Sequence, residues 1–185
     1  SHEIRTPINA VMGMNEMILR ESKDKNILEY SANIKSASGN LLNIINDILD
    51  ISKIESGKFE IINEDYEIGA VLYDIKNLIS VRLIEKDVRF ELEVEENIPS
   101  IVNGDAVRVK QILINILGNA VKFTKEGYIR LAVESRSKED GTVMLIFKVS
   151  DTGIGIREEN IKKLFGIFTQ VDTKKNHSVE GTGLG

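Results

Sequence analysis

The sequence predicts an α+β protein made of two parts, a helical hairpin over residues 1–57 and a two-layer α/β sandwich over residues 58–185. Two patterns predict this division. In the first part, apolar residues recur at alternating steps of three and four, as on one side of a helix. From Lys58 onward, segments that alternate apolar and polar residues, typical of strands, are separated by segments with helical spacing.

The composition restricts the classes of function. At 185 residues and 42% hydrophobic content, the chain can bury a packed core. Its 24 basic and 29 acidic residues leave a net charge of -5 and therefore no broad attraction for nucleic acid or an anionic membrane. The absence of cysteine excludes disulfides and thiolate metal sites. No apolar run approaches the roughly 20 residues needed to span a bilayer, so we expect a soluble segment. The lack of cysteine fits a reducing compartment, and we expect the segment to be cytoplasmic.

The hairpin is predicted from two amphipathic helices joined by a polar turn, "ESKDKN", at residues 21–26. The longer helix has apolar residues at coiled-coil spacing: Ile27, Tyr30, Ile34, Ala37, Leu41, Ile44, Ile48 and Ile51. A second stripe, Leu42, Ile45 and Leu49, widens this apolar face. The shorter helix contains Ile4, Ile8, Val11 and Ile18. Because one hairpin supplies only half of a four-helix bundle, we expect a homodimer.

The longer helix should end near Gly57, which can adopt the left-handed C-terminal conformation. Beyond it, we expect strands at "KFEII" (58–62), at "VRFELEV" (88–94), and on both sides of a turn at residues 140–141. Helical spacing predicts two further helices, over residues 68–86 and 105–122.

Polar residues with a geometric role are predicted on the second of these helices, in "QILINILGNAVKFT" (111–124). Asn115, Asn119 and Lys122 are spaced by four and three and share one face. The apolar residues Ile112, Leu113, Ile116 and Leu117 are expected largely on the other face. Asparagine is a mediocre helix former, but an amide oxygen suits Mg²⁺ and a lysine ammonium reaches phosphate. An ordinary solvated face is the alternative.

Two glycine-rich stretches provide a second group of candidates. "DTGIGI" (151–156) follows a predicted strand, and the Asp151 carboxylate is a directional acceptor for an amino group such as that of adenine. Gly153 and Gly155 permit a ligand to approach the backbone closely. "GTGLG" (181–185) would expose backbone N–H groups to an anion. Each stretch alone is weak, because such glycines also form simple turns.

The segment between these stretches, residues 157–180, is predicted to be a mobile lid. Its first half has the pattern of a short amphipathic helix that contains Leu164, Phe165 and Phe168. The chain begins without Met inside a helical segment and stops at the second glycine stretch. We therefore expect a fragment that is cut at both ends.

Five segments, in this order and at these distances, resemble the H, N, G1, F and G2 boxes of two-component sensor histidine kinases. They are "SHEIRTP", "NILGNAVKFT", "DTGIGI", "LFGIFTQVD" and "GTGLG". The resemblance covers essentially the whole chain. It implies a dimeric phosphotransfer hairpin followed by an ATP-binding sandwich, with ATP and Mg²⁺ as cofactors. It also implies autophosphorylation of a histidine, transfer of the phosphoryl group to an aspartate of a response-regulator receiver domain, and a membrane-anchored parent protein.

The resemblance also implies roles for individual residues. His2 would be the phosphoacceptor and Glu3 the general base that accepts its proton. Thr6 matches the residue that positions water when relatives dephosphorylate the regulator. Asn119, assisted by Asn115, would ligate Mg²⁺, and Lys122 would contact phosphate. Asp151 would accept from the adenine amino group, Gly153 and Gly155 would shape the pocket, and the phosphates would be covered by Thr182, Gly183, Leu184 and Gly185.

Two other classes of function are considered. One is a dimeric scaffold whose nucleotide site is vestigial, which the presence of His2, Asn119 and Asp151 disfavours. The other is an ATPase or serine kinase that shares only the sandwich, which the hairpin with His2 and Glu3 disfavours.

Overall fold

The computed structural model describes residues 2–161. Contacts between Cα atoms divide these residues into two compact units that separate between Glu60 and Ile61. In the described part of the chain, no helix combines the length and the apolar character needed to cross a membrane.

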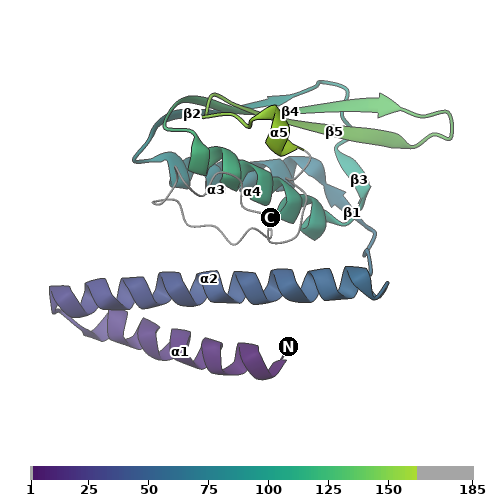
Figure 1. Cartoon of the computed structure of the whole chain (residues 1–185). Coiled ribbons are helices and arrows are strands. Elements are labelled where there is room, and N and C mark those ends of the chain that lie inside the picture. The colour runs from purple at the N-terminus through teal and green to yellow at the C-terminus, as the bar shows by residue number, and fades with distance from the viewer. Residues whose placement is uncertain (1, 162–185) are drawn as a thin grey trace. The chain divides into compact units, whose positions relative to one another are not determined.

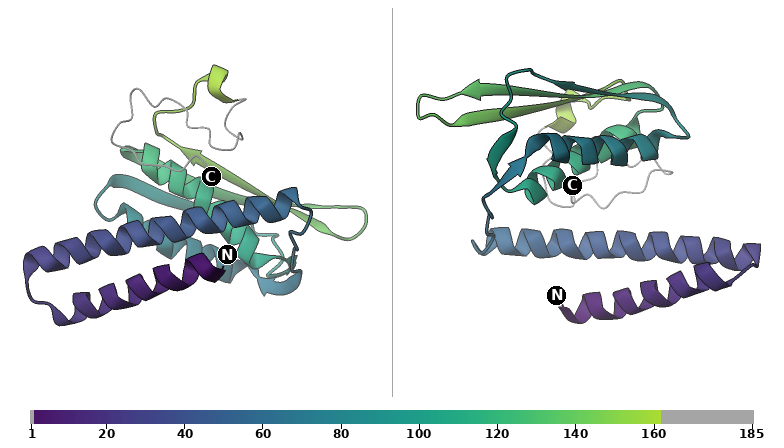
Figure 2. Two further views of the ribbon diagram at one scale, coloured as in Figure 1. Left: turned by 60° about the horizontal axis from the view of Figure 1, so that its bottom comes forward. Right: turned by 180° about the vertical axis from the view of Figure 1, so that it is seen from behind.

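The first unit is a helical hairpin of α1 (His2–Glu21) and α2 (Lys25–Glu55), which lie side by side (Figures 1 and 2). Asp24 caps the start of α2, because its Oδ1 accepts hydrogen bonds from the backbone N–H groups of Asn26 at 2.8 Å and Ile27 at 3.3 Å. These N–H groups have no partner within the helix. The hairpin expected from the sequence is confirmed.

A glycine in the left-handed conformation ends α2, as the sequence predicts. Gly57 has φ of 67° and donates its backbone N–H to the carbonyl of Ile54 at 3.0 Å. The N–H of Lys58 reaches the carbonyl of Lys53 at 2.9 Å. This pair of bonds is a Schellman motif, which satisfies carbonyls at the end of the helix.

One buried polar contact joins the two helices. The Asn15 side chain donates through Nδ2 to the Ser31 carbonyl at 2.7 Å, and both residues are buried. The Oδ1 of Asn15 has no hydrogen-bond partner in the described structure. A buried polar pair of this kind favours one register of two helices over others, at a cost in stability.

The hairpin leaves many of its apolar side chains exposed. Leu42, Ile45 and Leu49 are half-buried. An exposed stripe instead follows positions seven residues apart: Ile4, Val11 and Ile18 in α1, and Ile27, Ile34, Leu41 and Ile48 in α2. This exposed stripe contains half of the coiled-coil positions predicted for the longer helix.

The second unit contains a mixed sheet with helices on one face (Figures 1 and 2). In the order β2-β4-β5, the strands are β2 (Asp87–Val94), β4 (Glu126–Ser137) and β5 (Val143–Asp151). β2 is parallel to β4, and β4 is antiparallel to β5. The helices are α3 (Ile68–Leu83), α4 (Ala106–Phe123) and the short α5 (Glu158–Ile161). A separate antiparallel pair consists of β1 (Glu64–Glu67) and β3 (Ile101–Gly104).

The core of this unit lies between the sheet and helices α3 and α4. Alternate residues of β4, Ile129, Leu131 and Val133, are almost completely buried on the side of the helices. Ile75 and Ile79 of α3 and Leu113 and Leu117 of α4 complete this layer. The α+β architecture expected from the sequence is therefore confirmed.

One local expectation is wrong. Residues 58–62, "KFEII", form no strand, and the N–H of Ile62 instead donates to the Asp105 carboxylate at 3.1 Å. On the predicted apolar face of α4, Leu113 and Leu117 are buried, whereas Ile112 and Ile116 are 59% and 45% exposed. Periodicity alone cannot locate the edge of a helix's buried face.

Helix α4 has a buried and an exposed apolar side. Shortening an apolar side chain to alanine should therefore affect the free energy of unfolding unequally on the two sides. Leu117→Ala should lower the free energy of unfolding by about 2–5 kcal/mol, because Leu117 is fully buried. Ile112→Ala, the matched control, should change it by less than about 1 kcal/mol. Urea denaturation of both variants checks this, and equal losses would contradict the packing described.

Candidate functional site

The polar face of α4 is formed by Asn115, Asn119 and Lys122. Both asparagines are exposed, and neither side chain makes a hydrogen bond within the described residues. The Lys122 ammonium lies 5.2 Å from the centre of the Phe123 ring. The two amide groups are therefore accessible to a ligand, whereas a structural asparagine in a helix usually bonds a neighbour.

Beside this polar face, α4 borders an apolar cleft of about 470 Å³. Its lining comes from α4 and β5 and consists of Val109, Ile112, Leu113, Ile116, Phe147 and Val149. The exposed Ile112 and Ile116 thus lie along the cleft. Val149 lies two residues before Asp151 on β5, so the apolar cleft borders the candidate residues on both elements.

The start of α4 is fixed by Asp105. Its Oδ1 accepts the N–H of Arg108 at 3.0 Å, and its Oδ2 accepts the N–H of Ile62. These two backbone bonds, that of Arg108 first, lower the pKa of Asp105. A carboxylate at this position also interacts favourably with the positive end of the helix dipole.

A tight turn follows β5, and Asp151 and Gly153 define it. The Asp151 Oδ1 accepts the N–H of Gly153 at 2.8 Å. Its Oδ2 has no hydrogen-bond partner among residues 2–161, so this oxygen remains an acceptor for a ligand. Gly155, two residues after Gly153, has φ of 67°, which a residue with an L side chain rarely adopts.

Gly153 is required here for a different reason, the close approach of two backbones. A Cβ on Gly153 would lie 2.7 Å from the carbonyl oxygen of Phe123 and 2.7 Å from the Asp151 Oδ1. Phe123 is the last residue of α4 and follows Lys122 directly. The structure therefore places the end of α4 against the turn that contains Asp151, and so brings together the two groups predicted from the sequence.

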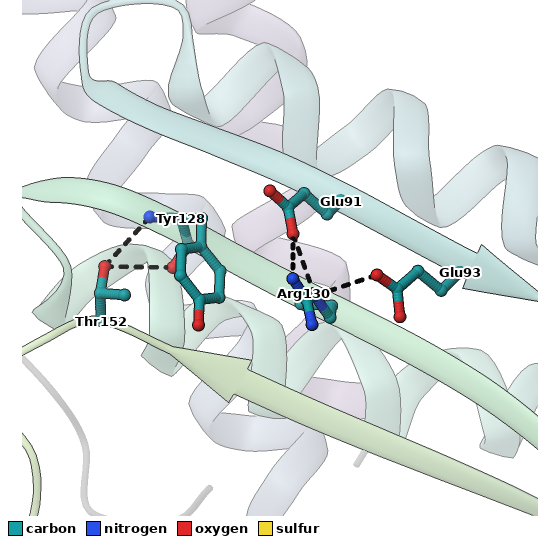
Figure 3. Close-up of polar contacts among 5 residues, drawn as sticks. All are labelled: Glu91, Glu93, Tyr128, Arg130 and Thr152. Carbon is teal, nitrogen blue, oxygen red and sulfur yellow. Dashed lines mark hydrogen bonds and ion pairs between the residues drawn. The ribbon is translucent and has the colours of Figure 1, made fainter.

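Thr152 attaches this turn to the adjacent strand, as Figure 3 shows. Its Oγ1 accepts the N–H of Tyr128 at 3.0 Å and lies 3.0 Å from the carbonyl of Glu126. Gly127, with φ of 103°, leaves the space for this hydroxyl, because a Cβ there would lie 2.2 Å from Oγ1. Sequence reasoning missed Thr152, since a hydroxyl beside a glycine is common in turns.

The face of the sheet away from the helices presents charges that neutralise one another. Arg130 bonds Glu91 at 2.8 Å and Glu93 at 3.2 Å, and it lies beside the Tyr128 ring (Figure 3). The hydrogen bond to Glu91, followed by the charge of Glu93, raises the pKa of Arg130. Because these groups already have partners, we place the candidate site at α4 and the Asp151 turn rather than on this face.

The other predicted site residues lie in the first unit or outside the described residues. His2, Glu3 and Thr6 lie in the first turns of α1, in the hairpin unit. Thr182, Gly183, Leu184 and Gly185 lie outside the described residues, as does the predicted lid beyond α5 with Leu164, Phe165 and Phe168. In residues 2–161 no group of three or more His, Cys, Asp or Glu could hold a metal. The side-chain oxygens of α4 itself are the amide oxygens of Gln111, Asn115 and Asn119.

Two family models match the chain. The His Kinase A (phospho-acceptor) domain matches residues 1–57. The family described as histidine kinase-, DNA gyrase B-, and HSP90-like ATPase matches residues 104–185. Its range includes α4, the Asp151 turn and the second glycine stretch.

Full-length relatives are much longer than this chain. Hybrid signal transduction histidine kinase B of Dictyostelium discoideum is 42% identical over 185 residues, which are all of this chain and 9% of that protein. Signal transduction histidine-protein kinase BarA of Escherichia coli K12 is 36% identical over 185 residues, again all of this chain and 20% of that protein. The chain thus spans a fifth or less of the length of these two relatives.

Solved histidine kinases share the fold. Full-length ShkA in complex with AMPPNP superposes with a TM-score of 0.76 at 30% identity, over 99% of this chain and 37% of that chain. Histidine kinase ThkA in complex with the response regulator protein TrrA superposes with a TM-score of 0.56 at 25% identity, over 91% of this chain and 48% of that chain. With both domain models matched in order and the hairpin and sheet unit observed, the chain belongs to the two-component sensor histidine kinase family.

Proposed function

We propose that this chain is the core of a protein-histidine kinase that uses Mg-ATP to phosphorylate His2 and passes the phosphoryl group to an aspartate of a response regulator. One observation supports the nucleotide site most directly. The exposed amides of Asn115 and Asn119 lie on a helix whose last residue contacts the turn containing Asp151. Metal-binding, phosphate-binding and amine-accepting groups are thus combined in one unit.

At this site, each residue that the structure describes has a role that its position supports. The second carboxylate oxygen of Asp151 accepts a hydrogen bond from the adenine amino group. Asn119, assisted by Asn115, offers amide oxygens to Mg²⁺, which neutralises phosphate charge when bound. Lys122 contacts phosphate as a point charge. Gly153 and Gly155 leave room for the ligand. Thr182, Gly183, Leu184 and Gly185 lie outside the described residues, and their proposed role at the phosphates rests on the family resemblance alone.

In the proposed transfer, a ring nitrogen of His2 attacks the γ-phosphorus of ATP. The new N–P bond forms as the bond between this phosphorus and the bridging oxygen breaks, with ADP as the leaving group. Glu3, the neighbour of His2 and exposed in α1, accepts the imidazole proton. Catalysis is mainly positioning and charge neutralisation. Thr6, one turn further along α1, positions water when the regulator is dephosphorylated.

We further propose residues 1–57 as the phosphotransfer and dimerisation domain and residues 58–185 as the ATP-binding domain. The exposed stripe of α1 and α2 supports dimerisation, because a second hairpin would cover it and complete a four-helix bundle. ThkA, a structural neighbour, was solved with a response regulator protein, which supports a receiver domain as the partner. The cytoplasmic location and a membrane-anchored parent protein remain predictions.

Labelling with γ-labelled ATP and Mg²⁺ tests the enzymatic proposal. His2→Gln should abolish acid-labile, alkali-stable label, whereas His177→Gln, which alters the other histidine, should keep it. Asn119→Ala should lower the labelling rate by about 100-fold, because a charge-stabilising contact is lost. Asn77→Ala, an exposed asparagine of α3, serves as its control. Label retained in His2→Gln would contradict the proposed acceptor, and an unlabelled wild-type chain that still binds ATP would favour a scaffold.

Dimerisation can be tested at the exposed stripe. Leu41→Glu places a charge on a surface that a second hairpin would desolvate, so it should convert a dimer into a monomer. Ser36→Glu, at an exposed position of α2 outside the stripe, should leave the dimer intact. Sedimentation equilibrium measures the mass of each, and a Leu41→Glu variant that remained dimeric would rule out this interface.

Gly153→Ala should weaken binding of the ATP analogue AMPPNP by at least about tenfold, because a methyl group 2.7 Å from the Phe123 carbonyl forces the turn away from α4. Gly69→Ala is the matched control, since a Cβ there meets nothing within 4 Å. This control should keep its affinity and gain up to about 1 kcal/mol of stability. Isothermal titration calorimetry gives both affinities, and equal values would exclude the proposed contact.

A further inference from the structure

A charged side chain outside all the motifs binds the end of α4. Lys86 lies between α3 and β2, and its half-buried side chain donates through Nζ to the carbonyl oxygens of Val121 and Thr124. The distance to the Thr124 oxygen is 3.3 Å. In sequence, Lys86 is 35 residues from Val121 and 38 residues from Thr124, so these contacts are tertiary.

The two carbonyls lie at the C-terminal end of α4, where a positively charged group stabilises a helix. The last carbonyls of an α-helix have no N–H partner within it and form the negative end of its dipole. Thr124 is the C-cap of α4, and its own N–H returns to the Ala120 carbonyl at 2.9 Å. The Lys86 ammonium therefore adds two hydrogen bonds at a helix end where the backbone supplies the bond from Thr124 to Ala120.

The residues between these two carbonyls link Lys86 to the candidate site. Lys122 and Phe123 lie between Val121 and Thr124, so Lys86 binds the backbone on both sides of them. The Phe123 carbonyl is the atom that Gly153 approaches closely. The orientation of this last turn thus decides where Lys122 points and how the Asp151 turn sits against α4.

We infer that Lys86 is a positioning residue of the nucleotide site, which binds the Val121 and Thr124 carbonyls and so fixes the last turn of α4 against the Asp151–Gly153 turn. The inference rests on the proposed function, in which this site binds Mg-ATP. In this inference Lys86 acts through the backbone carbonyls that it binds, rather than through a contact with the nucleotide or the metal. Only the geometry assigns this role to Lys86, because nothing in the sequence around "IEKDV" distinguishes Lys86 from a surface lysine.

The test compares Lys86→Met, which removes the ammonium and keeps the aliphatic stem, with Lys86→Arg, which restores a cationic donor. Lys76→Met, at an exposed lysine of α3, is the matched control. Ile79→Val in the core controls for loss of stability alone. Binding of AMPPNP with Mg²⁺ to the whole chain is measured by calorimetry, at a temperature where melting curves show every variant folded.

Lys86→Met should raise the Kd of AMPPNP by about tenfold or more, as expected for the loss of a charged hydrogen-bond donor. Lys86→Arg should bring the Kd back to within about threefold of wild type, and both controls should leave it unchanged. A Lys86→Met chain that melts earlier but binds AMPPNP as tightly as wild type would overturn the inference, because Lys86 would then only stabilise the fold.

Hydrogen exchange of the Thr124 amide separates this inference from the proposed function. Faster exchange of this amide in Lys86→Met supports the fixing of the helix end, and unchanged exchange contradicts it. If the wild-type chain binds no AMPPNP, the proposed function fails, and the Thr124 amide still decides whether Lys86 orders this turn.

Discussion

Helix α4 both closes the core of the second unit and carries polar groups of the candidate site. The arrangement of the second unit depends on how this one helix does both. One side, with Leu113 and Leu117, closes the core against the sheet, while Asn115 and Asn119 face solvent. A helix fixes the angles between these sets, so the core determines where the polar groups point. Opposite charges at the two ends, Asp105 at the start and Lys86 at the end, suit the helix dipole.

Much of this architecture could be predicted from the sequence, because periodicity reports which side of an element is apolar. The hairpin and its end at Gly57 are confirmed. The same signal was wrong for "KFEII", because a strand needs a partner and the N–H of Ile62 found the Asp105 carboxylate instead. The short strands β1 and β3 were missed, since only their mutual pairing defines them.

The candidate site was predicted as separate motifs, and the structure adds how some of them meet. Asn119 and Asp151 could be proposed from spacing and residue type. The contact between the Phe123 carbonyl and Gly153 could not, because it joins backbones 30 residues apart. The role of Lys86 could not be predicted for a similar reason. Its partners are backbone carbonyls, which every residue has, so no pattern in the sequence points to them. The hairpin motif at His2 belongs to the other unit, and its chemistry rests on the family assignment.

We propose that α4 and the Asp151 turn form a single nucleotide site. The most direct measurement is amide NMR of the whole chain titrated with AMPPNP and Mg²⁺. If α4 and this turn form one site, the largest changes in amide chemical shift fall on two segments, residues 115–124 and 151–155. Changes confined to the outer face of the sheet around Arg130, or absent from one of the two segments, would contradict the proposal.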